Sequence, residues 1–190
     1  QEIIDGINER EDCRLYTSIE LGGMLVFGGN PAALIQLAEQ LPPEQDRFPM
    51  GLHNHAAFHT PLQKPIAATA REQLSPSLFH SPRLPMIDGR GHLWSPYSSD
   101  PEAIWDYTLG HQVYEYYDFS KAVEVTVKEF APDRVIILGP GSTLGGAVAQ
   151  SLINIGWQGL ASKQDFIERQ QSDPLVLSMG IDQQRRQVTG

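Results

Sequence analysis

Apolar runs bounded by glycine and proline divide the chain into alternating strands and helices. The run GGMLVFGG, residues 22–29, is continuously apolar between glycines, which is typical of a buried strand. Asn30 followed by Pro31 is a helix start signal, and AALIQLAEQL then repeats its apolar residues on one helix face. Two prolines at 42 and 43 end this predicted helix.

Similar start and stop signals occur along the rest of the chain. We predict helices over residues 1–12, 61–74, 101–113, 120–130 and 142–156, and strands over residues 47–54, 84–91 and 134–141. Strands separated by helices predict a mostly parallel sheet with helices on its faces, so the expected fold class is α/β.

Composition narrows the classes of partner. Fourteen basic and 23 acidic residues give a formal net charge of −9, and no cluster of lysine and arginine offers a surface for phosphates. We therefore expect neither nucleic acid nor an anionic membrane as a partner. No apolar run reaches the roughly 18 residues of a membrane span, and no signal peptide is visible. A single cysteine, Cys13, predicts no disulfide and no structural zinc site, which favours the cytoplasm.

The most distinctive chemistry lies in HNHAAFHTPL, residues 53–62. No aspartate or glutamate adjoins its histidines to complete a metal site, so we expect no metal. A solvated or backbone-bonded loop histidine is the expected state of His53, His55, His80, His92 and His111. His59 differs because it follows two alanines and Phe58 and precedes a helix start at Pro61, which would hold its imidazole at the mouth of a cleft. A base there needs a nucleophile and an acceptor for its second nitrogen.

The stretch AAFHTPL resembles the active-site histidine segment, AFH[ST]P, of the malonyl-CoA:acyl carrier protein transacylases and of the acyltransferase domains of polyketide and fatty acid synthases. Four further stretches resemble segments of this family in the same order along the chain. They are MLVFGG, LPMIDGRG, HQVYEYYDFSKAV and RVIILGPGSTLGG. The five segments lie within residues 14–155.

The resemblance implies a two-lobed α/β enzyme with a large α/β-hydrolase-like lobe, built of parallel strands and covering helices, and a small ferredoxin-like lobe. Residues 1–55 would form the small lobe with its N-terminal connection, and residues 56–155 the C-terminal portion of the large lobe. Residues 156–190 match nothing in the family and are expected to be a terminal helix or a linker. The implied reaction moves an acyl group from coenzyme A to the phosphopantetheine thiol of an acyl carrier protein. Acyl-CoA is then a substrate, and no cofactor is implied.

Two site residues follow from the resemblance. His59 would be the general base, first for a serine and then for the carrier thiol, a task suited to a group that titrates near neutrality. Gln112 would accept a hydrogen bond from the second imidazole nitrogen through its main-chain carbonyl. An aromatic residue before the histidine, here Phe58 after Ala57, resembles malonyl-selective members and favours malonyl as the acyl group.

The sequence also departs from the family. The nucleophilic serine of the family lies in a GHS[LIV]G elbow upstream of the matching region, and no G-x-S-x-G occurs here. Ser142 in PGSTLG is no substitute because Pro140 stands where the elbow needs glycine, so a structural turn is expected there. ELGGM also replaces the family's N.PGQ. Since the chain begins at Gln1, we expect the C-terminal part of an acyltransferase, inactive alone, with a missing N-terminal half or further synthase domains as partners.

Two other functions stay open at this point. The chain could be a non-catalytic module of the same fold that binds a carrier protein or acts as a scaffold, which predicts a complete gene product of this size. It could also belong to a serine thioesterase or another hydrolase, which would release free acid without any carrier protein. Fold analogy alone does not distinguish these functions.

Overall fold

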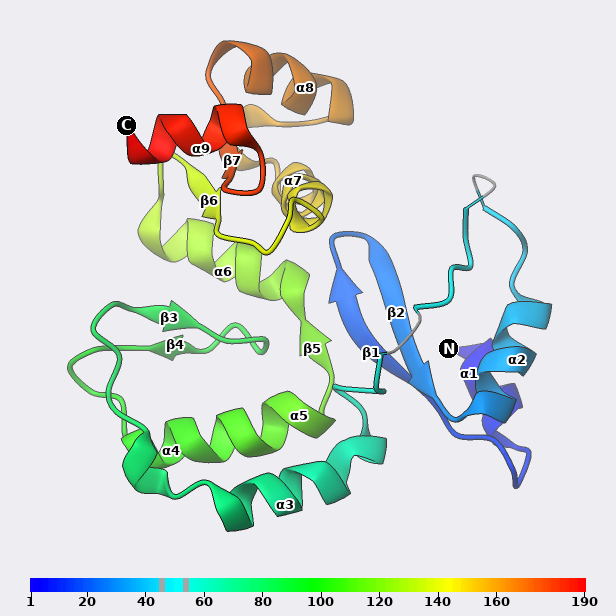
Figure 1. The fold of residues 1–190 in the computed structure, drawn as a ribbon. Coiled ribbons are helices and arrows are strands. Elements are labelled where there is room, and N and C mark those ends of the chain that lie inside the picture. The colour runs from blue at the N-terminus through cyan, green and yellow to red at the C-terminus, as the bar shows by residue number, and fades with distance from the viewer. Residues whose placement is uncertain (45–46, 53–54) are drawn as a thin grey trace. The chain divides into compact units, whose positions relative to one another are not determined.

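The computed structural model describes residues 1–44, 47–52 and 55–190. These residues form two compact units, each built from several segments of the chain (Figure 1). Unit 1 contains residues 1–19, 25–86 and 94–117, and unit 2 contains residues 20–24, 87–93 and 118–190. The predicted division into the consecutive ranges 1–55, 56–155 and 156–190 concerns the lobes of a whole enzyme and stays a prediction.

The first elements are two helices that flank a hairpin. They are α1 (Glu2–Asn8), β1 (Leu15–Leu21), β2 (Met24–Gly29) and α2 (Pro31–Gln40). Gly22 and Gly23 form the two-residue turn of the hairpin, with φ of 58° and 86°, the left-handed values that favour glycine in such turns. The predicted strand at 22–29 is thereby confirmed as β2, whereas β1 is not among the predicted elements.

Helix α2 begins where the sequence predicts. The side-chain oxygen of Asn30 accepts a hydrogen bond from the main-chain N–H of Ala33, and Pro31 occupies the first helical position. The strand predicted over residues 47–54 is wrong for its described part, residues 47–52, where Phe48 makes only an isolated bridge to Glu44. Pro49 has no N–H to donate to a strand neighbour, and this explains the absence of a ladder there.

Helix α3 and its neighbours follow. The elements are η1 (Pro61–Gln63), α3 (Lys64–Gln73), η2 (Pro76–Leu78), β3 (Met86–Ile87), β4 (Leu93–Trp94), α4 (Pro101–Asp106), the π-helical η3 (Tyr107–His111), α5 (Gln112–Tyr114) and β5 (Tyr117–Asp118). Asp100 caps α4 by accepting from the main-chain N–H of Glu102, as predicted. The single helix predicted over 101–113 is present, but it contains a π-helical turn that the sequence does not predict.

The remaining elements are α6 (Phe119–Phe130), β6 (Val135–Ile137), α7 (Leu144–Asn154), η4 (Trp157–Gly159), α8 (Lys163–Ser172), β7 (Val176–Ser178) and α9 (Asp182–Thr189). Strands β6 and β7 pair in parallel, with Val135 opposite Val176 and Ile137 opposite Ser178. Among the described residues the other sheets have the order β2-β1-β5 and β3-β4. The predicted α/β class is confirmed, with small mixed sheets.

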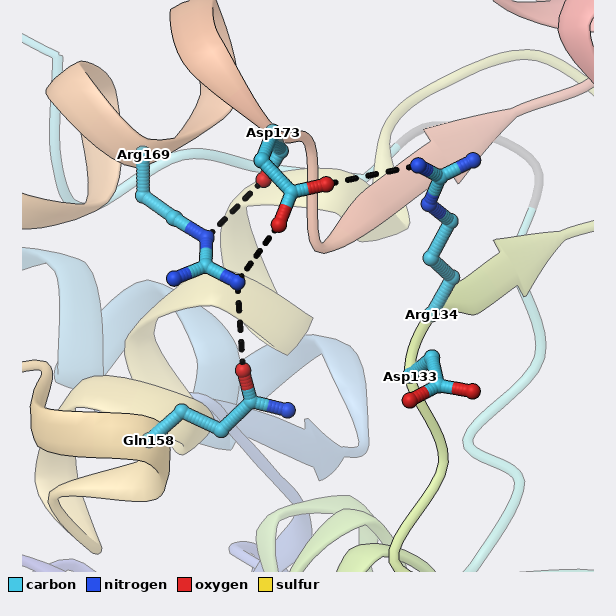
Figure 2. Close-up of a pocket in the computed structure, with 5 residues that line it drawn as sticks. All are labelled: Asp133, Arg134, Gln158, Arg169 and Asp173. Carbon is cyan, nitrogen blue, oxygen red and sulfur yellow. Dashed lines mark hydrogen bonds and ion pairs between the residues drawn. The ribbon is translucent and has the colours of Figure 1, made fainter.

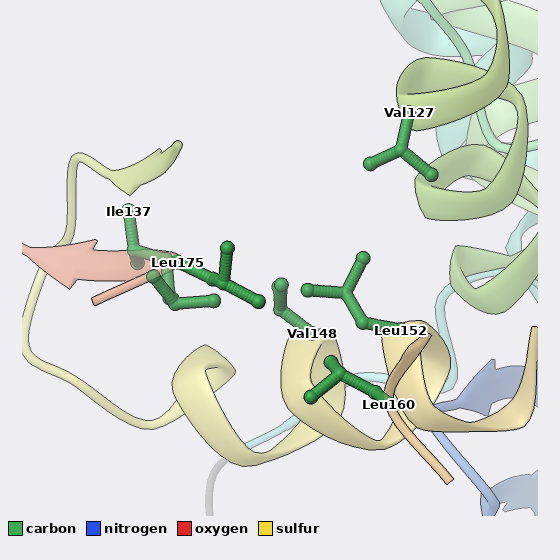
Figure 3. Packing of buried hydrophobic residues seen from close by; sticks show 7 residues of the cluster. Val127, Ile137, Val148, Leu152, Leu160 and Leu175 are labelled. Atoms are coloured by element: carbon green, nitrogen blue, oxygen red, sulfur yellow. The ribbon is translucent and has the colours of Figure 1, made fainter. Parts of the chain in front are cut away.

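Each unit has its own apolar core. In unit 2, Val148 and Leu152 project from α7 into a cluster with Ile137 and Leu175, and Val127 approaches Leu152 from α6 (Figure 3). In unit 1, α1, β1 and α2 bury one cluster, and a second surrounds α4. The first consists of Ile4, Ile7, Cys13, Leu15, Ala33 and Leu37, and the second of Trp94, Ile104 and Tyr107. Within the described ranges, no helix is both long and apolar enough to span a membrane.

Candidate active site

The backbone at His59 is in an unusual conformation. Its φ is 59°, in the left-handed region that a residue with a side chain seldom occupies; strained backbone of this kind clusters at functional sites. Two hydrogen bonds hold the chain on either side of this bend. The main-chain N–H of His59 donates to the carbonyl of Val113 at 2.8 Å, and the hydroxyl of Ser18 on β1 donates to the carbonyl of Phe58 at 2.8 Å. The strained bend is therefore fixed by groups distant in sequence.

Small residues let this segment lie close to strand β2. Thr60 is completely buried, and its hydroxyl donates to the carbonyl of Ala57 at 2.6 Å. Gly28 faces both residues: a Cβ placed on it would lie 2.8 Å from Cγ2 of Thr60 and 3.2 Å from Cβ of Ala57. The chain then enters η1 at Pro61 and continues into α3, as the sequence predicts.

The imidazole of His59 lies half-buried between protein groups. Its ring centroid is 5.0 Å from that of Tyr117, with the planes tilted by 50°. Burial lowers the pKa of His59, and the nearby main-chain carbonyl of Gln112 acts in the opposite direction with a smaller effect. In the part of the chain that the structure describes, its buried Nδ1 makes no hydrogen bond of good geometry. The lowered pKa favours the neutral ring, the form that can accept a proton.

Gln112 reaches His59 because of the π-helical turn that precedes it. The main-chain N–H of Gln112 donates to the carbonyl of Tyr107, five residues earlier, and also to that of Gly110. The turn is anchored by Tyr107, which is buried against Trp94 with ring centroids 5.9 Å apart. The structure thus brings together the two residues named from the sequence, His59 and Gln112.

The other histidines have varied surroundings. His111 stacks on Tyr107 with ring centroids 5.7 Å apart, and His80 is exposed. His53 lies outside the described residues. Among the residues that are described, no group of three histidine, cysteine, aspartate or glutamate side chains is arranged to hold a metal ion.

Ser142 lies in the turn between β6 and α7, the strand-to-helix turn that the sequence predicts. Its main-chain carbonyl accepts from the N–H of Gly145 at the start of the helix. The preceding Gly141 accepts a hydrogen bond from the hydroxyl of Ser178 at 3.3 Å, and Gly180 packs against the same residue. These contacts describe a tightly packed connection.

A charged hollow of about 690 Å³ in unit 2 was not found from the sequence (Figure 2). It is lined by Asp133, Arg134, Gln158, Arg169 and Asp173. The carboxylate of Asp173 accepts from Arg169 at 2.7 Å and from Arg134 at 3.3 Å, so one acid pairs with both guanidinium groups. Because these pairs are partly exposed, each contributes at most about 1 kcal/mol. The ion pairs of this hollow connect the end of α8 to the residue before β6. The local sequence gives no signal for them.

No protein-family model and no curated protein sequence matches this chain. Solved structures do match it, and they define the fold as that of part of an acyltransferase. The acyl-carrier-protein S-malonyltransferase of Burkholderia pseudomallei 1710b has a TM-score of 0.67 at 17% identity, over 98% of this chain and 54% of that one. The malonyl-CoA:acyl carrier protein transacylase of Xanthomonas oryzae pv. oryzae gives a TM-score of 0.67 at 17% identity, over 98% and 52%.

The acyltransferase domain from the second module of the salinomycin polyketide synthase is also similar, with a TM-score of 0.60 at 18% identity, over 94% of this chain and 36% of that one. The chain therefore has the fold of the malonyl-CoA:acyl carrier protein transacylases and polyketide synthase acyltransferases, as its sequence motifs predict. It spans about half the length of the malonyltransferases that it matches.

Proposed function

We propose that this chain is the histidine-bearing part of an acyltransferase that moves an acyl group from coenzyme A to the phosphopantetheine thiol of an acyl carrier protein. The observation that best supports this proposal is the environment of His59. Its backbone is fixed in a strained bend by Ser18 and Val113, and its ring lies half-buried beside the carbonyl of Gln112. This arrangement supports a base that is held in one orientation by neighbouring groups.

In the first half of the reaction, His59 takes the proton of a serine hydroxyl supplied by the part of the fold that this chain does not span. The serine oxygen bonds to the thioester carbonyl carbon, the carbon–sulfur bond breaks, and His59 returns the proton to the sulfur of coenzyme A. In the second half, the carrier thiol gives its proton to His59 and attacks the acyl-serine. The ester bond breaks and the serine recovers the proton.

Gln112 has the role of orienting this base. In the neutral imidazole, one ring nitrogen carries the proton and the other carries a lone pair. A main-chain carbonyl accepts only from a protonated nitrogen, so it fixes which of the two nitrogens carries the proton. The carbonyl of Gln112 binds the protonated nitrogen and leaves the other one available to the serine. The same carbonyl favours the imidazolium that forms after proton transfer, which agrees with its upward effect on the pKa of His59.

Malonyl is the acyl group that we propose. Phe58, directly before His59, has 46% of its surface exposed and is available to contact an acyl group. Three of the structural neighbours carry malonyltransferase or malonyl-CoA transacylase in their descriptions. A comparison of malonyl-CoA with a branched acyl-CoA as donor tests this part of the proposal independently of the transfer itself.

The decisive experiment uses the natural polypeptide that carries these residues, with malonyl-CoA and a phosphopantetheinylated carrier protein. Acyl transfer is followed by the intact mass of the carrier. His59→Ala is expected to lower the rate by about 10²-fold or more, the usual contribution of a general base. His80→Ala removes an exposed histidine of the same unit and is the matched control.

Transfer at the wild-type rate in His59→Ala would overturn the proposal. Release of free malonate without a carrier protein would identify a thioesterase instead. Carrier binding without any transfer would identify a scaffold module.

A further inference from the structure

Arg71, in the last turn of α3, holds the helix that leads to Gln112. Its Nη2 donates to the main-chain carbonyl of Asp106 at 2.9 Å and forms an ion pair with the carboxylate of the same residue. Its guanidinium lies over the ring of Trp105, with Cζ 5.3 Å from the ring centroid. Trp105 in turn donates from Nε1 to the carbonyl of Leu74 at the end of α3, at 2.7 Å. The two helices are thus tied at several points around one arginine.

The same guanidinium occupies the space that a side chain at Gly110 would need. A Cβ placed on Gly110 would lie 2.0 Å from Nη2 of Arg71 and 3.0 Å from its Cζ. Glycine in a helix interior costs about 1 kcal/mol relative to alanine. Here the glycine is the fourth residue of the five-residue π-helical turn, and the guanidinium of Arg71 occupies the space beside it.

The π-helical turn decides where the following carbonyls point. It contains one residue more than an α-helical path would need between the same ends. If it relaxed to an α-helix, the residues after it would rotate by about 100° around the helix axis. The carbonyl of Val113 would then leave the N–H of His59, with which it makes a hydrogen bond of 2.8 Å, and the carbonyl of Gln112 would leave the imidazole.

We propose that Arg71 is a positioning residue for His59: packed between Trp105 and Gly110, it holds the π-helical turn in place. The turn in turn directs the carbonyls of Gln112 and Val113 at His59. Arg71 touches neither His59 nor any reacting atom in this scheme and acts only through the helix. The catalytic value of this arrangement rests on the function proposed above, but the arrangement itself can be tested without an activity assay.

The test measures amide hydrogen exchange in the full chain carrying Arg71→Met. Protection of the His59 amide, the donor to Val113, is expected to fall by about tenfold more than protection of the Leu41 amide, the donor to Leu37 in the same unit. A merely structural loss of stability would lower both amides together. Arg10→Met, which removes an exposed ion pair with Asp12, is the matched control and should leave the ratio unchanged.

A second variant checks the role of the glycine. Gly110→Ala forces the guanidinium away and should lower His59 protection in the same way, while the double variant Arg71→Ala with Gly110→Ala should be no worse than Arg71→Ala alone. If Arg71→Met does not fold, Arg71→Lys replaces it in the test. The lysine keeps the positive charge beside Asp106 but cannot stack as a planar group on Trp105.

An unchanged ratio of His59 to Leu41 protection in folded Arg71 variants would overturn the inference, whatever the activity. A lowered ratio together with full acyl transfer by His59→Ala would instead leave the positioning role intact and refute the proposed function.

Discussion

Gly28 on β2 and Thr60 beside the candidate base are in such close contact that no side chain fits between them. A Cβ on Gly28 would lie 2.8 Å from Cγ2 of Thr60, closer than real Cβ contacts permit. Thr60 is completely buried, so relief of such a contact would have to displace neighbouring groups of the protein. The strand therefore supports the segment that bears His59, and the size of residue 28 controls the position of that segment.

Gly28→Ala is accordingly expected to destabilise the chain by about 1–3 kcal/mol, the usual cost of overpacking. Chemical denaturation gives the change in the free energy of unfolding. Gly6→Ala is the matched control, since a Cβ on Gly6 meets nothing within 4 Å in helix α1. That change should stabilise by up to about 1 kcal/mol because alanine favours the helix. Equal effects at the two glycines would contradict the packing described here.

The left-handed backbone of His59 predicts a difference between two variants that both lack the ring. His59→Gly should be more stable than His59→Ala by about 1 kcal/mol, because only alanine brings a Cβ into the left-handed region. Neither variant should retain the base. Thermal or urea unfolding of the pair measures the difference, and an alanine variant as stable as the glycine variant would show that the bend is not strained.

The pH dependence follows from the lowered pKa of His59. Burial lowers this pKa more than the carbonyl of Gln112 raises it, so the ring loses its proton below the ordinary histidine value of about 6.5. We expect kcat/KM for acylation to rise with pH, with an apparent pKa below about 6.5, and to level off above that pKa. A pH–rate profile checks this, and an apparent pKa above that value would contradict it.

The same shift affects stability. Between the lowered native pKa and about 6.5, the unfolded chain binds more protons at this residue than the folded chain does. The free energy of unfolding should therefore rise with pH across this window, and it should fall as the pH drops from 6.5 through the native pKa. The contribution of His59 is the difference between the wild type and His59→Ala, measured by urea unfolding across the window.

Asp88 predicts acid sensitivity in unit 2. Its side chain is only 3% exposed, and burial by itself raises its pKa, but the Arg90 guanidinium at 2.6 Å and the N–H groups of Arg90 and His92 lower it overall. Asp88→Asn should cost about 1–3 kcal/mol at pH 7, because it removes the charge that these donors share. The stabilisation by Asp88 is lost as pH falls below about 4 through the native pKa, so the two proteins should converge there. A difference that persists in acid would contradict this.

The sequence predicts the helices with clear start signals, and it predicts the two candidate residues. Asn30 with Pro31, and Asp100 with Pro101, each place a capping oxygen directly before a proline, and both helices begin there. These signals are local, which is why they are readable from one chain. Strand β1 was missed because the glycine pair at 22 and 23 indicates the edge of one strand and equally the turn between two.

Other features depend on partners far along the chain. The π-helical turn before Gln112 follows the same apolar pattern as an ordinary helix, and Arg71, which packs against it, lies in another helix. The bend at His59 likewise depends on Ser18 and Val113. Such features need the three-dimensional contacts, whereas the family resemblance could name His59 and Gln112 without them.

Residues 156–190, expected to be a terminal helix or a linker, contain a strand that completes a sheet. Strand β7 pairs with β6, and the hydroxyl of Ser178 holds the carbonyl of Gly141 in the turn before α7. A shortened polypeptide that stops near residue 160 would leave β6 without its neighbour and expose the apolar side of α7 to water. Expression boundaries should accordingly lie beyond α9, and alignments that stop at the glycine-rich turn omit part of the folding unit.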